Sequence, residues 1–165
     1  MTQATTTQNG WMQQQELLSE VQRCVDLFNS QVFLNNSVFR QSAFIELLVR
    51  LNYVLQVLDK NSKRITWTDD LEVTKKIKDI TDLVNNLRNA ACHQESRRNF
   101  VEGTNLKFVF NTITGEVPRA IQIGNKFLGC DYADDIAFYY GDKKIYLVRH
   151  IKKLLEELPN LIKTK

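Results

Sequence analysis

The spacing of apolar residues changes at Glu102-Gly103, and this change constrains the fold more than any other feature of the chain. Before it, apolar side chains recur every three or four residues, which is typical of amphipathic helices. After it, short β-branched and aromatic runs alternate with turn residues, which is typical of antiparallel strands. The sequence therefore predicts a mainly α fold of about four helices, with a small antiparallel β insert at about 104–141.

The N-terminal part of the chain predicts a tail and two helices. Residues 1–10 are rich in Thr and Gln and carry no charge, so we expect a disordered tail. One helix is predicted from about Trp11 to Phe28. A second, at about 38–58, is apolar almost all round, which is typical of a central core helix, of half a subunit interface, or of both.

Two further helices are predicted on either side of the strands. Asp69, with Glu72 three residues later, resembles a capping box and predicts the start of the third helix. The apolar residues of this helix form one stripe: Val73, Ile77, Ile80, Val84, Leu87 and Ala91. The fourth helix is predicted to begin at Asp142 as its cap, with Pro159 at its end or at a bend.

The β insert is predicted from four short runs: 106–113, 120–123, 126–130 and 136–140. Gly124-Asn125 suits a two-residue hairpin turn, with glycine at the first central position. The length of 165 residues suits one domain with a substantial core. Residues 11–165 are therefore expected to form a single domain that contains the insert.

Composition narrows the possible functions. The chain is 43% apolar and 25% charged, which favours a globular fold over disorder. Its net charge of +3 permits contact with phosphate without indicating a surface devoted to nucleic acid. The cysteines Cys24, Cys92 and Cys130 are widely separated, which favours reduced thiols in a cytoplasmic protein. No zinc spacing, signal peptide or membrane-spanning run is visible, so no metal, cofactor or membrane partner is expected.

A candidate site closes the third predicted helix. Arg88 can hold a phosphate with two parallel hydrogen bonds, and Asn89 can orient either partner. His93 can take a proton from a hydroxyl near pH 7. On an ideal helix, Arg88 and His93 would lie about 140° apart and would not converge. Their cooperation would need the helix to bend or stop near Ala91–His93, or a second copy of the chain to supply one of them.

The run Arg88-Asn89-Ala90-Ala91-Cys92-His93 resembles the motif of the HEPN superfamily, an arginine followed after four to six residues by a histidine. The resemblance implies an up-and-down helical bundle and a homodimer whose two motifs share one cleft. It also implies metal-independent ribonuclease activity in toxin–antitoxin, antiviral defence or RNA-processing settings, with an antitoxin or nucleotidyltransferase as partner. Some members carry a tyrosine two residues after the histidine, where AMP is attached, and this chain has Glu95 there.

The resemblance implies RNA cleavage by attack of the 2′-hydroxyl on its own phosphate. His93 would act as base or acid, Arg88 would hold the non-bridging oxygens, and Asn89 would orient the phosphate or the imidazole. Arg97 and Arg98 are predicted to bind the RNA backbone. The activity would be restricted to RNA because it needs the 2′-hydroxyl.

Structural roles for the same residues stay open. Arg88 could pair with Asp82 or Glu95, and His93 could simply favour a helix C-terminus. His150 is expected on a helix surface. The carboxylates of Asp131, Asp134 and Asp135 are better explained by turn chemistry than by metal binding.

Two other function classes also remain. The chain could be a dimeric, non-catalytic interaction module, or an RNA- or nucleotide-binding sensor that does not cut. A Ser or Cys hydrolase is disfavoured, because neither a nucleophile-elbow motif nor an activated cysteine setting is visible.

Overall fold

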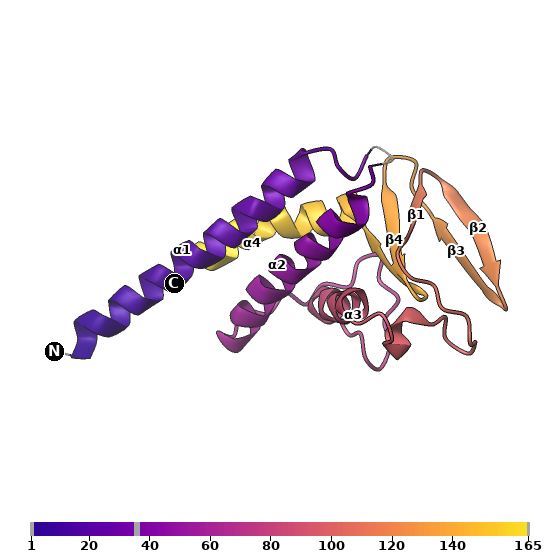
Figure 1. Cartoon of the computed structure of the whole chain (residues 1–165). Helices are drawn as coiled ribbons and strands as arrows, with labels where there is room; N and C mark the ends of the chain where they lie inside the picture. The colour runs from indigo at the N-terminus through magenta and orange to yellow at the C-terminus, as the bar shows by residue number, and fades with distance from the viewer. Residues whose placement is uncertain (1, 35–36, 165) are drawn as a thin grey trace. The chain divides into compact units, whose positions relative to one another are not determined.

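The computed structural model describes residues 2–34 and 37–164, which divide into two compact units. One unit comprises Met1–Arg64 and Leu154–Lys165, and the other comprises Ile65–Lys153. The first unit is built from helices, whereas the second carries the strands and α3 (Figure 1).

The first unit contains α1 (Thr2–Asn29), α2 (Arg40–Lys60) and nearly all of α4 (Lys153–Lys163). The core role predicted for the second helix is confirmed, since α2 buries one continuous face: Ala43, Phe44, Leu47, Leu48, Leu51, Asn52, Val54, Leu55 and Leu58. Gln14 on α1 donates from Nε2 to the carbonyl of Ile162 on α4 at 3.0 Å. α1 begins at Thr2, so most of the predicted tail is helical, while residue 1 lies outside the described residues.

The second unit holds two antiparallel sheets (Figure 1). In the first, β4 (Ile136–Tyr140) lies between β1 (Asn111–Thr114) and β5 (Lys143–Tyr146). The second sheet is the hairpin of β2 (Val117–Ile123) and β3 (Lys126–Cys130). All five residues of β4 are buried, so this strand is the centre of the unit's core.

Several strand predictions are confirmed. β3 and β4 have the predicted bounds, and the Gly124-Asn125 turn joins β2 to β3 with Ile123 opposite Lys126. The first predicted strand is shorter than expected, because β1 begins at Asn111 rather than at Leu106.

The predicted fold class, a mainly α up-and-down bundle with a small insert, is wrong. Among the described residues, four α-helices accompany five strands in two sheets, which is a mixed α/β fold. Two stretches expected to be helical account for the difference. Residues 69–79 lie before α3 (Ile80–Cys92), and residues 143–146 form β5.

The third predicted helix begins eleven residues later than Asp69, because local hydrogen bonds compete with the helix. The Thr74 hydroxyl accepts from the backbone N–H groups of Lys76 and Ile77 at 3.2 and 3.1 Å. Such side-chain bonds offer the backbone an alternative to helical pairing. The cap of α3 is Asp79, whose Oδ1 accepts from the N–H of Asp82 at 2.9 Å. Asp69 and Glu72 therefore do not form the predicted capping box.

Asp142 is not the cap of the fourth helix, since it lies in the turn between β4 and β5. The helical region instead starts with a π-helix at Leu147–Lys152, followed by α4. Its first N–H groups are satisfied from another part of the unit, because the buried Asp135 carboxylate accepts from Val148 and Arg149 at 2.8 and 3.0 Å. Pro159 lies inside α4 rather than at its end.

His150 is buried, not on the helix surface as predicted. Its Nδ1 accepts from the N–H of Tyr146 at 3.1 Å, so the neutral ring carries its proton on Nε2, which faces the carbonyl of Asp69 at 3.1 Å. Burial lowers the pKa of His150 to about 4. The imidazole therefore stays neutral at pH 7 and serves as a fixed internal hydrogen-bonding group.

This burial predicts a stability that depends on pH. The unfolded chain protonates His150 below about pH 6.5, whereas the folded chain does so near pH 4, so stability should fall as pH drops through this window. The difference between these two pKa values corresponds to about 3 kcal/mol in the free energy of unfolding. This contribution is fully present above pH 6.5. Urea unfolding between pH 4 and 7, compared with His150→Gln, measures this contribution. Equal pH slopes for the two proteins would contradict the assignment.

Candidate functional site

The predicted motif lies at the C-terminal end of α3. The helix ends at Cys92, and His93 is its C-cap with φ −128° and ψ 89°. The helix therefore stops near Ala91–His93, which is one of the two possibilities that the sequence left open. The His93 side chain is exposed, and Arg88 and Asn89 are half-buried.

The side chains of Arg88 and Asn89 hold one another. Arg88 donates to Oδ1 of Asn89 at 2.9 Å, and Nδ2 of Asn89 donates to Oδ1 of Asn85 at 3.2 Å. Within residues 2–34 and 37–164, no hydrogen bond joins Arg88 to His93. Among the described residues, the structure thus joins two of the three predicted catalytic residues, Arg88 and Asn89, by a hydrogen bond, and neither is bonded to the exposed His93 side chain.

A buried amide fixes the end of the helix. Nδ2 of Asn99 lies 3.0 Å from the carbonyl oxygens of Ala90 and His93 and 3.1 Å from that of Gln94. Asn99 is fully buried and closes a 3-10 helix at Arg97–Asn99. One side chain therefore fixes the backbone of His93 relative to the turn that carries the two arginines.

A groove of about 700 Å³ lies in the second unit and includes both arginines predicted to bind RNA. Its lining comes from four separate segments of the chain: 74–77, Asn86, 97–104 and 142–143. We call it the basic groove; it is lined by Thr74, Lys75, Lys76, Ile77, Asn86, Arg97, Arg98, Phe100, Val101, Glu102, Gly103, Thr104, Asp142 and Lys143.

The two acidic residues of the basic groove, Glu102 and Asp142, are paired with lysines. Lys143 Nζ lies 3.0 Å from Asp142 and 3.8 Å from Glu102, and Lys126 also pairs with both carboxylates. Burial by itself would raise the pKa of Asp142, but the hydrogen bonds from Lys126 and Lys143 hold it below its ordinary value. Asp142 is therefore ionised at neutral pH and compensated by both lysines.

The other cations of the basic groove have no such compensation. In the described part of the chain, no carboxylate pairs with Lys75, Lys76, Arg97 or Arg98. Arg97 instead lies over the ring of Phe100, with its guanidinium carbon 5.6 Å from the ring centroid. The groove therefore combines excess positive charge with an aromatic ring, which is chemistry suited to phosphate and bases.

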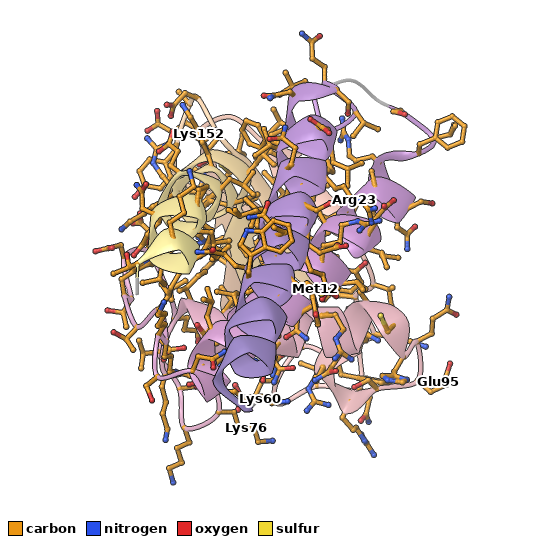
Figure 2. The ribbon with its side chains drawn as sticks, turned by 90° about the vertical axis from the view of Figure 1, so that its left-hand side faces the viewer. Met12, Arg23, Lys60, Lys76, Glu95 and Lys152 are labelled. Atoms are coloured by element: carbon orange, nitrogen blue, oxygen red, sulfur yellow. The ribbon has the colours of Figure 1, made fainter. Side chains whose placement is uncertain are left out.

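Arg88 does not face this groove. Asn86 lines it, and Arg88 lies two residues further along the same helix, about 200° around the axis. Of the two ion pairs that the sequence left open for Arg88, the one with Glu95 does not form among the described residues. Glu95, at the surface in Figure 2, pairs with Lys107 at 2.9 Å.

Sequence reasoning found Arg97 and Arg98 but missed the other residues of the groove. Lys75 and Lys76 were placed inside the third predicted helix, which hid their position in an irregular segment. Gly141 was also missed, although Gly141-Asp142 is a turn signal. An alanine Cβ at Gly141 would lie 2.5 Å from the carbonyl oxygen of Arg98, so the β4–β5 turn packs directly against the arginine segment.

The carboxylates of Asp131, Asp134 and Asp135, which were predicted to have a structural role in a turn, are all bonded to other groups of the protein. Asp131 accepts from Lys144 at 2.7 Å and from the Tyr146 hydroxyl at 2.5 Å. Asp134 pairs with Arg149 at 3.0 Å, and Asp135 caps the π-helix. Among the described residues, no group of three potential metal ligands comes together.

The cysteines offer no activated nucleophile inside the core. Cys24, Cys92 and Cys130 are free thiols, and Cys24 and Cys130 are buried. Burial raises the pKa of Cys24 to about 12, so its thiol stays protonated at neutral pH.

None of the helices in the described ranges combines the length and hydrophobicity needed to cross a membrane. Comparisons with protein-family models, with curated proteins and with solved structures found no match to this chain.

Proposed function

We propose that this chain binds RNA through the basic groove. The observation that carries the proposal is the convergence of Lys75, Lys76, Arg97 and Arg98, without carboxylate partners in the described chain, beside an aromatic ring. Cations placed in this way attract a phosphate backbone and release its counterions. RNA is preferred to DNA because the Arg88–His93 run resembles that of HEPN proteins. An RNA ligand also agrees with the cytoplasmic location predicted from the cysteines.

Removing three of these cations should weaken binding in a way that depends on salt. The test variant is Lys75→Ala/Lys76→Ala/Arg98→Ala, which spares Arg97 because it packs over Phe100. Each lost phosphate contact should flatten the plot of log K against log salt by about 0.7, so the triple variant should lose about 2 from the slope. Fluorescence anisotropy with labelled RNA at several salt concentrations measures both affinity and slope.

Lys152 supplies the matched control. It is an exposed lysine in the same unit that does not line the groove, and it lies well away from Lys76 in Figure 2. Lys152→Ala should leave affinity and slope close to those of the unaltered protein. A loss of about 0.7 from the slope for Lys152→Ala, one third of the loss in the triple variant, would mean that RNA responds to net charge and not to this groove.

A second candidate function is metal-independent RNA cleavage at His93. The observation that favours it is the end of α3 at this residue, which leaves its imidazole exposed beside a backbone fixed by Asn99. In the proposed reaction, the imidazole takes the proton of the 2′-hydroxyl as the 2′-oxygen bonds to phosphorus. The bond to the 5′-oxygen then breaks, and that oxygen takes up a proton, leaving a 2′,3′-cyclic phosphate. Arg88 is bonded to Asn89 and not to His93, so in this reaction a second copy of the chain supplies the phosphate-holding arginine, as the HEPN resemblance implies.

Cleavage is tested by incubating the pure protein with mixed single-stranded and structured RNA in EDTA. The proposal expects cyclic-phosphate ends, at least a hundredfold less product with His93→Ala, and a comparable loss with Arg88→Ala. RNA that stays intact while it is bound would leave binding as the function and would reject cleavage. Product that persists in both variants would come from another residue or from a contaminating nuclease.

A further inference from the structure

We infer that the basic groove takes single-stranded rather than double-stranded RNA, with a base held against the ring of Phe100. The inference rests on the proposed RNA binding and adds the class of RNA. Three features of the groove carry it: its size, the place of Phe100 in its lining, and its neutral polar side chains.

The size of the groove suits a few nucleotides rather than a duplex. Its volume of about 700 Å³ lies within the range typical of pockets that enclose a small ligand. Double-stranded RNA is instead recognised across successive grooves by contacts spread over a long surface. Here the cations without carboxylate partners line one pocket. Lys75 and Lys76 come from the segment before α3, and Arg97 and Arg98 come from the 3-10 helix after it. A flexible single strand can place its phosphates and one base together in such a space.

Phe100 has the properties of a stacking platform. It is half-buried and lines the groove, and its backbone is held by the bridge to Lys107 and by its N–H, which donates to the carbonyl of Arg97 at 3.2 Å. The Arg97 guanidinium over the ring adds a second planar group on which a base can stack. Proteins that bind single strands combine a cationic groove with aromatic rings in this way.

Asn86 adds a polar group that can contact a base edge or a 2′-hydroxyl. Its half-buried amide lines the groove and offers both a donor and an acceptor. Beside it, Gly103 leaves open space, because an alanine Cβ built there would meet no heavy atom within 4 Å. The groove therefore has cations for phosphate, a ring for a base, and an amide for hydrogen bonds.

The experiment compares one labelled single strand of RNA with the duplex formed from it and its complement, at the same series of salt concentrations. The intact protein should bind the single strand at least 10-fold more tightly than the duplex. Phe100→Leu, which keeps an apolar side chain but removes the ring, should weaken single-strand binding about 5- to 100-fold without changing the salt slope. Phe100→Tyr, which keeps the ring, should bind within about 2-fold of the unaltered protein. Thermal unfolding verifies that each variant is folded.

A readout on the unaltered protein keeps the test independent of these variants. A 2-aminopurine base in the single strand should lose fluorescence on binding if it stacks on the ring. Equal affinity for strand and duplex, with no loss in Phe100→Leu, would overturn the single-strand inference. The proposed RNA binding would still stand in that case if the triple lysine and arginine variant lost affinity. Failure of the intact protein to bind either form would overturn both proposals.

Discussion

Replacing Gly141 with alanine should destabilise the protein by about 3–5 kcal/mol and abolish RNA binding at the basic groove. Gly141 has φ +58°, a conformation that costs a residue with a Cβ about 1–2 kcal/mol. In addition, the new Cβ would lie 2.5 Å from the carbonyl oxygen of Arg98 and 2.8 Å from that of Phe100. Both contacts are with backbone, so relief requires the segment that carries the groove's arginines to move away from the β4–β5 turn.

The chain supplies a matched control at Gly124. This glycine has φ +59°, but the nearest atom to an added Cβ is a Thr104 methyl at 3.9 Å. Gly124→Ala should therefore lower the free energy of unfolding only by the cost of the backbone strain, about 1–2 kcal/mol. The variant should still bind RNA. Urea unfolding and anisotropy on both variants separate strain from steric clash. Similar losses for the two substitutions would show that the turn does not press against the arginine segment.

The local parts of the fold were predictable because neighbouring residues determine them. The Gly124-Asn125 turn predicted the β2–β3 hairpin, and the short β-branched and aromatic runs predicted β3 and β4. The second predicted helix is apolar almost all round, and this indicated a place in the core as one of its possible roles, which α2 takes. In each case the information lies within one short stretch of chain.

The errors arose where distant residues decide the local structure. The carboxylate of Asp135 caps a π-helix that begins twelve residues later, so Asp142 looked like the better cap. Residues 143–146 become β5 by pairing with β4, and their sequence alone does not exclude a helix. The stripe from Val73 to Ala91 has helical spacing, but the bonds to Thr74 favour an irregular segment before α3.

The candidate site was predictable only in part for the same reason. Arg97 and Arg98 were recognised as adjacent cations, but their convergence with Lys75 and Lys76 depends on tertiary packing. Asn99 carried no sequence signal, because an asparagine after two arginines gives no sign that its amide will be buried against three carbonyl groups. The role of this amide in fixing the site can nevertheless be measured directly.

Asn99→Asp should lower the free energy of unfolding by about 3–5 kcal/mol, because it places an unpaired carboxylate against the end of α3. The Asn99 amide donates toward the carbonyl oxygens of Ala90, His93 and Gln94, all within 3.1 Å. An aspartate of nearly the same shape loses every donor and turns negative oxygens toward these acceptors. In acid the carboxyl becomes neutral and can donate one hydrogen bond, so the loss should shrink as pH falls. Urea unfolding at pH 7 and pH 5 measures both effects.

Asn61→Asp makes the same substitution at an exposed helix end. The Asn61 amide donates to the carbonyl of Val57 at 2.8 Å at the C-terminus of α2, where water can replace the lost donor. This control substitution should lower the free energy of unfolding by less than about 1 kcal/mol, and this loss should vary little between pH 5 and 7. If Asn99→Asp were as mild as this control, the buried amide would not hold α3 to the arginine turn. His93 and the basic groove would then be free to move independently, and a shared role in binding or cutting RNA would lose its structural basis.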